Sequence, residues 1–384
     1  MNPNLKRMSP FIVMEVLEKA QAMERAGTDV VHLEVGEPDF NMPRCVVRAA
    51  QAAYEQNRTH YTHSLGDPEL REAIAALYKR EYGVTVEPDC ILVTSGSSPA
   101  ILMALQTLCD VGDEVMLSNP GYACYRNFAL ASHAEPREIR VRAENGFQFD
   151  VDEVRRAVNP RTRAIFVNSP MNPAGVLVAD AVYEGLAKLG VPILSDEIYH
   201  GLVYEGRARS VLEFTDNAFV LNGFSKRFAM TGLRLGYLIA PKRFMRPLQV
   251  LQQNLFICAS STAQRAGVAA LTDSSAAEEV ARMRTTYDER RRFMLGRLRE
   301  LGFGIYAEPQ GAFYIFADAR RFTKDAYAFA FDVLERAHVG ITPGVDFGTA
   351  GEGFVRFSYA NSLERIREGL ARLERYLAAR ASHG

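Results

Sequence analysis

The sequence has no long uncharged apolar run, and this absence excludes a class of protein. No stretch reaches the roughly 18 apolar residues that a membrane-spanning helix needs. The apolar run near the N-terminus, Phe11 to Met14, ends at Glu15 and is too short for the core of a secretory signal. We therefore expect a cytoplasmic protein without a membrane partner.

The chain also lacks an excess of charge of either sign. Among its 384 residues, 45 are basic and 46 are acidic, which gives a formal net charge of −1. A field that attracts nucleic acid or anionic lipid needs a basic excess. The arginine cluster from Arg290 to Arg292 lies among acidic residues, as on a solvated helix face. Nucleic acid is therefore not an expected partner, and a charged ligand must be bound by a few local side chains.

Cysteine is scarce and poorly spaced for its structural uses. The five cysteines are odd in number, lie far apart and form no C-x-x-C pair. This spacing argues against a disulfide framework and against a thiolate metal site, so free thiols are expected. His60 and His63 form an isolated H-x-x-H, and two histidines without further ligands are more typical of a polar loop than of a metal site. No metal is expected.

The chain also has no internal repeat, low-complexity tract or long linker, so its organisation must be inferred from the pattern of elements. Helical patterns lie between short apolar or β-branched runs, and this alternation predicts an α/β fold with a mostly parallel sheet flanked by helices. The predicted strands are Ile91 to Val93, Glu114 to Leu117, Ala164 to Val167, Pro192 to Leu194, Ala218 to Leu221 and Gly236 to Ile239. The predicted helices among them are Ala100 to Cys109, Asp152 to Val158 and Ala181 to Leu189.

The pattern changes after about Ser274. A long amphipathic helix is predicted from Ala276 to Leu301, and a last helix from Leu363 to Leu377. Short strands are expected between them, at Ala312 to Phe316 and Phe354 to Ser358.

These elements predict two domains. Residues 41–274 should form the large domain, and residues 1–40 and 275–384, the two chain ends, should form a smaller α+β domain. The predicted helix Met14 to Ala26 has too few partners to stand alone, so we expect it to pack on the smaller domain.

Three polar segments follow predicted strands. Ser97 and Ser98 lie in a Gly/Ser turn before a helix, where free backbone N–H groups and the helix dipole favour a phosphate, although the same residues are typical of a simple helix cap. Asn172, and Asp196 with Tyr199, follow two further strands; alone they read as a turn and a cap. Ligands of open α/β sheets bind outside the carboxyl ends of the strands, so we expect these side chains near one crevice.

Lys226 lies between a predicted strand and a largely apolar, Gly-bounded loop. Partial burial there lowers the pKa of a lysine and frees its amine to condense with a carbonyl. Arg234, eight residues later, offers a bidentate contact for a dianion.

Taken together, these groups match what a phosphorylated pyridine aldehyde needs. Lys226 would form an imine with the aldehyde and Asp196 would keep the ring nitrogen protonated. Asn172 and Tyr199 would stabilise the ring oxygen.

The whole chain resembles a class I/II aminotransferase of the pyridoxal-phosphate fold type I superfamily, near its aspartate and aromatic branch. The resemblance is carried by Val35 to Phe40, Tyr61 with Gly66 to Arg71, Asn168 to Gly175, Ser195 to Tyr199, Ser225-Lys226 with Met230 to Gly236, Gly311 to Tyr314, Pro343 to Phe347 and Val355 to Tyr359.

The resemblance implies roles for the matching residues. Lys226 would hold pyridoxal 5′-phosphate as an internal aldimine and shuttle a proton between the substrate Cα and C4′ of the cofactor. Arg356 would bind the substrate α-carboxylate, helped by the Gly36 backbone and Asn172. The remaining cofactor contacts would come from Tyr122, stacked on the ring, and from Ser97, Ser98, Ser225 and Arg234 around the phosphate. Tyr61 would reach the phosphate of a neighbouring subunit, which implies a homodimer.

Three departures from the family pattern bear on the site. Met171 and Ala174 stand where relatives commonly have Asn and Thr, and Gly223 stands where many have a phosphate-binding Ser. No residue matches an arginine for a second substrate carboxylate.

The implied function is a transferase, an aminotransferase that moves the amino group of an L-amino acid to a 2-oxo acid by a ping-pong mechanism. The family suggests 2-oxoglutarate as the acceptor. The donor stays open among aspartate, alanine, aromatic amino acids and methionine. Phe11, Ile12 and Phe256 are candidates for the pocket wall, with core packing as the alternative.

Two alternatives share the predicted cofactor site. A pyridoxal-phosphate lyase of the same fold would cleave a carbon–sulfur bond at Cβ or close a cyclopropane as an ACC synthase does. A ligand-sensing domain of a regulator would have no turnover, but a helix-turn-helix segment should precede it, and we expect none before Pro10.

Overall fold

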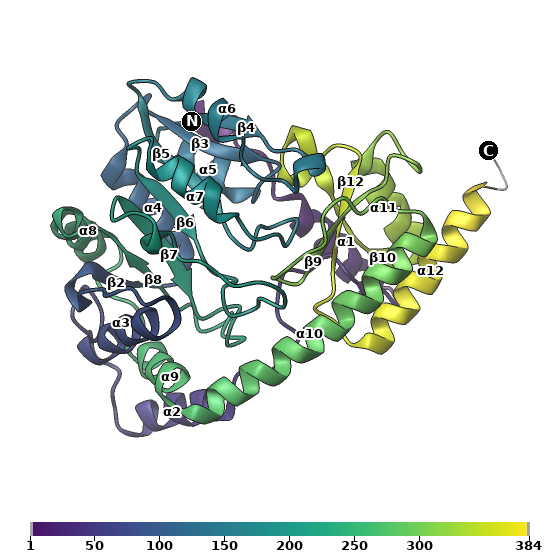
Figure 1. Ribbon diagram of the computed structural model, residues 1–384. Coiled ribbons are helices and arrows are strands. Elements are labelled where there is room, and N and C mark those ends of the chain that lie inside the picture. The colour runs from purple at the N-terminus through teal and green to yellow at the C-terminus, as the bar shows by residue number, and fades with distance from the viewer. Residues whose placement is uncertain (1–2, 382–384) are drawn as a thin grey trace.

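The computed structural model describes residues 3–381 and contains a seven-stranded sheet at its centre (Figure 1). The order of its strands is β2-β8-β7-β6-β5-β3-β4. Strands β3 to β7 run parallel to their neighbours, and β8 is antiparallel to both β7 and β2. The α/β prediction with a mostly parallel sheet is therefore confirmed. The strands are β2 (Ile91–Thr94), β3 (Glu114–Asn119), β4 (Glu135–Arg140), β5 (Thr162–Asn168), β6 (Ile193–Asp196), β7 (Ala218–Gly223) and β8 (Gly236–Ile239).

Strand β4 is absent from the sequence prediction, and its position explains why. It forms the edge of the sheet, and its residues Glu135 to Arg140 are mostly charged, with Ile139 alone buried. Charged residues are common on edge strands, where they discourage pairing with other chains. The apolar signal that identified the central strands is therefore missing from this one.

Helices cover both faces of this sheet, which is why its strands are nearly continuous apolar runs. Alternate residues of one strand enter different cores: Ile165 and Val167 pack in one cluster and Phe166 in the other. The helices on the Phe166 side include α4 (Ser97–Leu108), α5 (Cys124–Ala131) and α8 (Lys242–Leu255). Those on the other side include α3 (Pro68–Tyr82), α6 (Val151–Ala157), α7 (Asp180–Ala187) and α9 (Ser261–Thr272), with α2 (Arg44–Glu55) against α9.

The two ends of the chain meet in a second region. Strand β1 (Val31–His32) pairs in parallel with β10 (Val339–Gly340), and an antiparallel sheet has the order β11-β12-β9. Figure 1 shows the purple N-terminal helix α1 among the yellow-green C-terminal elements. The elements of this region are α1 (Ile12–Arg25), β9 (Tyr314–Asp318), α11 (Ala326–Ala337), β11 (Thr342–Pro343), β12 (Phe354–Ser358) and α12 (Leu363–Ala381). The packing of the N-terminal helix on the C-terminal module is thus confirmed.

Helix α10 (Ser274–Leu301) connects the two regions (Figure 1). It contacts α2 and α9 near its start and β9 and α12 further along. The Asp273 side chain caps its first turn through the Ser275 N–H at 2.9 Å, and Gly302 ends it in the left-handed conformation, φ 92°. Six short 3₁₀ turns complete the described elements: Pro3–Lys6, Pro88–Cys90, Ala143–Asn145, Val211–Glu213, Gly344–Phe347 and Thr349–Gly351.

Within residues 3–381, no helix combines the length and the apolar composition needed to cross a bilayer. The same residues contain no cluster of three or more His, Cys, Asp or Glu side chains suited to a metal ion.

Candidate active site

A cavity of about 400 Å³ lies where the carboxyl ends of the parallel strands face the C-terminal region. It is lined by segments that are far apart in the sequence. Every site residue predicted from the sequence lines it except Tyr61, namely Gly36, Ser97, Ser98, Tyr122, Asn172, Asp196, Tyr199, Ser225, Lys226, Arg234 and Arg356. Tyr61 is 80% exposed on the surface. The predicted crevice therefore exists, and it gathers the predicted groups into one space.

Lys226 follows the end of β7 and enters this cavity. Its Nζ donates a hydrogen bond to the Gly36 carbonyl oxygen at 2.7 Å. Burial lowers the pKa of the Lys226 amine to about 8, and the positive charges of Arg356 and Arg234 act in the same direction against the attraction of Glu37. A substantial fraction of the amine is therefore neutral near physiological pH, as a nucleophile or base requires.

Asp196 is the last residue of β6 and is 5% exposed. The Tyr125 hydroxyl donates to its Oδ2 at 2.7 Å, and the Ile198 N–H donates to its Oδ1 at 3.1 Å. Burial nevertheless raises the pKa of Asp196 to about 6, since these hydrogen bonds offset the loss of water only in part. A buried carboxylate of this kind is stabilised by a cationic ligand group placed against it.

Tyr125 is a site residue that the sequence prediction missed. It lies on α5, and its ring stacks on Phe166 at a centroid distance of 4.4 Å in the core beneath the cavity. An aromatic residue in an apolar helix pattern gives no sign that its hydroxyl reaches a carboxylate on a distant strand.

Arg356, on β12, is 2% exposed and has its guanidinium fixed on several sides. Its Nη1 donates to Asn172 Oδ1 at 3.0 Å, and its Nη2 donates to the Glu34 carbonyl oxygen at 2.7 Å. The rings of Tyr314 and Phe347 lie 4.1 and 4.9 Å from its Cζ. Within the described chain, its buried Nε has no hydrogen-bond partner. A planar guanidinium held in this way is suited to bind a carboxylate.

Tyr199 is buried, and its hydroxyl lies 3.0 Å from the hydroxyl of Tyr314. Burial raises the pKa of Tyr199 well above its ordinary value, so the hydroxyl stays protonated. Two hydroxyls that share one hydrogen bond leave one O–H free to donate into the cavity. Tyr314 belongs to a segment recognised in the sequence, but its place in the site was not predicted.

An anion-binding corner is formed by the start of α4 and by Arg234. Gly96 precedes the helix with φ 88°, and a Cβ at this position would lie 2.5 Å from Arg234 Nη2. Arg234 itself has a left-handed backbone, φ 51°, which is unusual for a side chain with a Cβ and is typical of functional sites. Ser97 and Ser98 form the first turn of α4, where N–H groups are free to bind an anion.

Of the three candidate wall residues, one lines the cavity and two pack in the core. Phe11 lines the cavity, and its ring meets Tyr122 edge-on at a centroid distance of 6.1 Å. Ile12 packs instead in the small cluster around Val16, and Phe256 packs against the core beneath α4 and α8. Phe11 precedes α1 in an extended conformation and Ile12 is the first residue of the helix, so their side chains point in different directions.

The fold and these groups define a family. The family model for aminotransferases of class I and II matches residues 28–373. The chain therefore belongs to this family, and it is a pyridoxal-phosphate-dependent aminotransferase.

Relatives match over nearly the whole chain. The chain is 40% identical to the (5-formylfuran-3-yl)methyl phosphate transaminase of Methanocaldococcus jannaschii, over 98% of this chain and 99% of the relative. It is 39% identical to the valine–pyruvate aminotransferase of Mycobacterium tuberculosis, over 96% of both. The structure of aspartate aminotransferase from Thermus thermophilus with maleate superposes with a TM-score of 0.94 at 37% identity, covering 98% of this chain and 99% of that one.

The residues present fit the cofactor of this family. The cradle at Gly96 is one that any Cβ would fill, and it places Arg234 beside the free N–H groups of α4, as a phosphate dianion requires. Asp196 supplies a buried anion for a protonated ring nitrogen, and Lys226 supplies a partly neutral amine.

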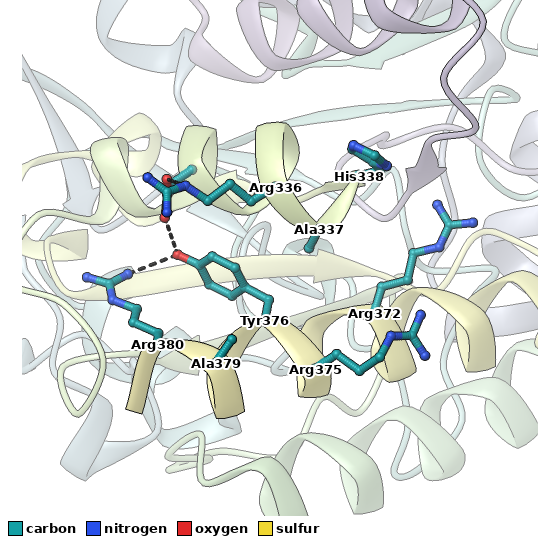
Figure 2. A pocket seen from close by; sticks show the side chains of 9 residues that line it. Arg336, Ala337, His338, Arg372, Arg375, Tyr376, Ala379 and Arg380 are labelled. Atoms are coloured by element: carbon teal, nitrogen blue, oxygen red, sulfur yellow. Dashed lines mark hydrogen bonds and ion pairs between the residues drawn. The ribbon is translucent and has the colours of Figure 1, made fainter. Parts of the chain in front are cut away.

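A second hollow, which shares no lining residue with this cavity, lies between α11 and α12 (Figure 2). Its volume is about 990 Å³, and its lining includes Arg336, Arg372, Arg375 and Arg380. Figure 2 shows Tyr376 between the two helices, where its hydroxyl accepts a hydrogen bond from Arg380 at 3.0 Å and donates one to Asp332 at 2.5 Å.

Proposed function

We propose that this aminotransferase uses Lys226 as its base, Asp196 as the anchor of the cofactor ring and Arg356 as the receptor of the substrate α-carboxylate. The observation that carries the proposal is the convergence of these three groups on one cavity from β6, β7 and β12. When bound, pyridoxal phosphate supplies a ring that withdraws electrons and makes the substrate Cα proton acidic.

Lys226 would take the proton from the substrate Cα. The lowered pKa of about 8 leaves part of the amine unprotonated, so it can act as a base without a strongly alkaline medium. Its present hydrogen bond to the Gly36 carbonyl oxygen shows that the side chain reaches the segment expected to flank the substrate.

Asp196 and its neighbours would orient the ring. The carboxylate would hold a proton on the ring nitrogen, and Tyr125 would fix the carboxylate through its 2.7 Å hydrogen bond. Asn172 and Tyr199 would donate to the ring oxygen, and Tyr122 would cover one face of the ring. Ser97, Ser98, Ser225 and Arg234 would hold the phosphate.

We propose that the enzyme is a homodimer in which Tyr61 reaches the neighbouring subunit's phosphate. Exposed apolar side chains near Tyr61 support this. Gln249 and Gln253 of α8 donate to Ser64 Oγ at 3.0 and 3.3 Å, which holds the loop around Tyr61 against that helix. The exposed apolar residues on α2, on this loop, on α8 and just beyond it are Tyr54, Tyr61, Val250, Leu255 and Ile257. Sedimentation equilibrium, with Tyr61→Phe assayed for cofactor affinity, tests the dimer and the shared contact separately.

The proposed reaction moves an amino group from an L-amino acid to a 2-oxo acid, with 2-oxoglutarate as the first acceptor to test, in the cytoplasm and by a ping-pong mechanism. The division near residues 40 and 274 into a large domain and a smaller one is part of the same proposal.

The deciding experiment is absorbance spectroscopy of the holoenzyme with amino acids and no acceptor. Stoichiometric conversion of the cofactor to its amine form supports transamination, whereas release of ammonia or a thiol without it would assign a lyase.

A further inference from the structure

One side of α1 forms an apolar wall of the active-site cavity. Phe11, Met14 and Leu17 all line the cavity that contains Lys226 and Arg356. Met14 and Leu17 are three apart on α1 and lie on one face, and Phe11, which directly precedes the helix, lines the same cavity, so the three side chains form an apolar ridge. Met14 is 45% exposed, which is unusual for a large apolar side chain and leaves its surface open to a ligand.

The opposite side of α1 fixes this ridge in place. Val16 and Ala20 are fully buried against Val30 and Leu334. The helix has no cap from its own N-terminal residue; instead, the Asp346 carboxylate accepts hydrogen bonds from the Ile12 N–H at 2.7 Å and the Val13 N–H at 3.3 Å. The ridge is therefore held by packing along one face and by a carboxylate at its first turn.

The position of the ridge corresponds to that of a substrate side chain. At the start of α1, the Phe11 ring contacts Tyr122, the residue proposed to cover the cofactor ring. Asp346, which bonds the next two residues of the chain, is followed by Phe347, whose ring centre lies 4.9 Å from the guanidinium carbon of Arg356. The start of α1 thus lies beside both the proposed ring site and the carboxylate-binding group.

The charges that the described residues of this chain contribute to the cavity leave none to pair with an acidic side chain. Among the described lining residues the cations are Lys226, Arg234 and Arg356, and each is already assigned to the amine, the phosphate or the α-carboxylate. Glu37 adds a negative charge near the entrance, where Thr231 donates to it. The short carboxylate of aspartate, placed against the ridge, would lose its water without gaining a partner.

We propose that Phe11, Met14 and Leu17 bind the substrate side chain and select amino donors with an apolar side chain, of the leucine, methionine and phenylalanine class, over aspartate. This inference rests on the proposed function, because it takes Arg356 as the receptor of the α-carboxylate.

Binding of substrate analogues that cannot react gives the first test. Calorimetric titration of the holoenzyme with 4-methylpentanoate, which is leucine without its amine, should give an affinity at least about tenfold higher than with succinate, which is aspartate without its amine. Equal affinities, or tighter binding of succinate, would overturn the proposed selectivity whatever the catalytic activity of the protein.

The second test measures the half-reaction of the holoenzyme with leucine and with aspartate. Leucine should convert the cofactor to its amine form with the higher second-order rate constant. If aspartate reacts as fast as leucine, the apolar selectivity is wrong and transamination stands. If neither leucine, aspartate nor any other amino acid of a panel reacts, both the apolar selectivity and the proposed function are wrong.

A charge placed on the ridge should change the preference. Met14→Lys should raise the aspartate-to-leucine ratio of the rate constants by about tenfold or more, because it gives the acidic side chain a partner. Ala22→Lys is the matched control, since it adds the same charge to the same helix at an exposed position outside the cavity. An unchanged ratio in a folded Met14→Lys protein, or an equal change in both variants, would contradict the role of the ridge.

Discussion

The cavity at Lys226 and the groove between α11 and α12 both contain arginines, and they differ in how those arginines are held. The groove between α11 and α12 is the larger, at about 990 Å³ against about 400 Å³ for the cavity at Lys226. In the groove, Arg336 pairs with Asp332 and Arg375 pairs with Glu368, each within one helix. Arg372 pairs with Glu368 and also with the distant Asp29. In the cavity, Arg356 is buried between two rings and bonded to segments more than 180 residues distant.

This difference teaches that convergence and burial identify a site better than volume does. Exposed pairs within one helix contribute little energy and are typical of solvated surfaces. The cavity brings a lysine, a carboxylate and two arginines together from distant segments, and their burial shifts the pKa values of Lys226 and Asp196 toward neutrality. Shifted values of this kind concentrate at functional sites because catalysis needs them.

The largest effect is expected at Lys226. Lys226→Ala should lower the transamination rate by at least about 1000-fold, since no other amine lines the cavity among the described residues. Steady-state assays with the best donor measure the loss. The variant should still bind pyridoxal phosphate through the phosphate corner, so retained binding is its control. Turnover near that of the unmodified protein would remove Lys226 from the mechanism.

The next largest effect is expected at Arg356. Arg356→Lys keeps the charge but loses the planar fork, and kcat/KM should fall by about 100-fold. The loss should appear for all amino donors alike, because they share the α-carboxylate, and cofactor absorbance should be unchanged. A loss confined to one donor would show that Arg356 binds a side chain instead.

The pKa of Lys226 predicts a pH dependence. The value is lowered from 10.5 to about 8, so the amine is charged below pH 8 and neutral above it. The rate at which cofactor-free protein condenses with pyridoxal phosphate should rise by about tenfold per pH unit below 8 and level off above it. Absorbance stopped-flow from pH 6 to 9.5 measures this profile. A continued rise to pH 9.5 would mean that burial does not lower the pKa.

Asp196 predicts a change in stability. The pKa of this carboxyl is raised from 3.8 to about 6 by burial, so its contribution to stability is present below pH 4 and lost as the pH rises through 6. Asp196→Asn does not titrate, and it should stabilise the cofactor-free protein by about 2 kcal/mol at pH 7.5 and hardly at all at pH 4. Urea unfolding at the two pH values measures the difference. An equal gain in the free energy of unfolding at pH 7.5 and at pH 4 would show that the charge of Asp196 is not its cause.

The smallest effect is expected in the groove. Arg336→Ala and Arg375→Ala remove well exposed arginines. In both variants kcat/KM should stay within about twofold, and the free energy of unfolding within about 0.5 kcal/mol, of the values of the unmodified protein. Assays and urea unfolding under the same conditions make the comparison. A tenfold loss of activity in either variant would show that volume, rather than burial, had marked a functional site.

The groups that could be predicted from the sequence are those that follow a strand directly. Asp196 ends β6, and Lys226 and Asn172 lie a few residues beyond β7 and β5, so parallel pairing alone brings them to one edge. Strand β4 escaped prediction because its exposed edge position removed the apolar signal.

Other parts of the site depend on distant contacts that leave no local signal. Tyr125 looks like a core residue of α5, although its hydroxyl bonds Asp196. Phe11 and Ile12 are equally apolar neighbours, and only the orientation of α1 decides which of them enters the cavity. That orientation is set by Asp346, more than 300 residues further along the chain.

The pairing of β1 with β10 has a consequence for the order of events during synthesis. Val31 bonds to the segment at His338, and the Ser358 N–H donates to the Leu33 carbonyl oxygen, so the first strand has no strand partner until nearly nine-tenths of the polypeptide has been made. Gly36 follows that strand in the sequence, and Arg356 is made shortly after the residues that pair with the strand. A nascent chain can therefore assemble its central sheet early, but it acquires the carboxylate-binding half of the catalytic centre last, and a chain released before this point is without it.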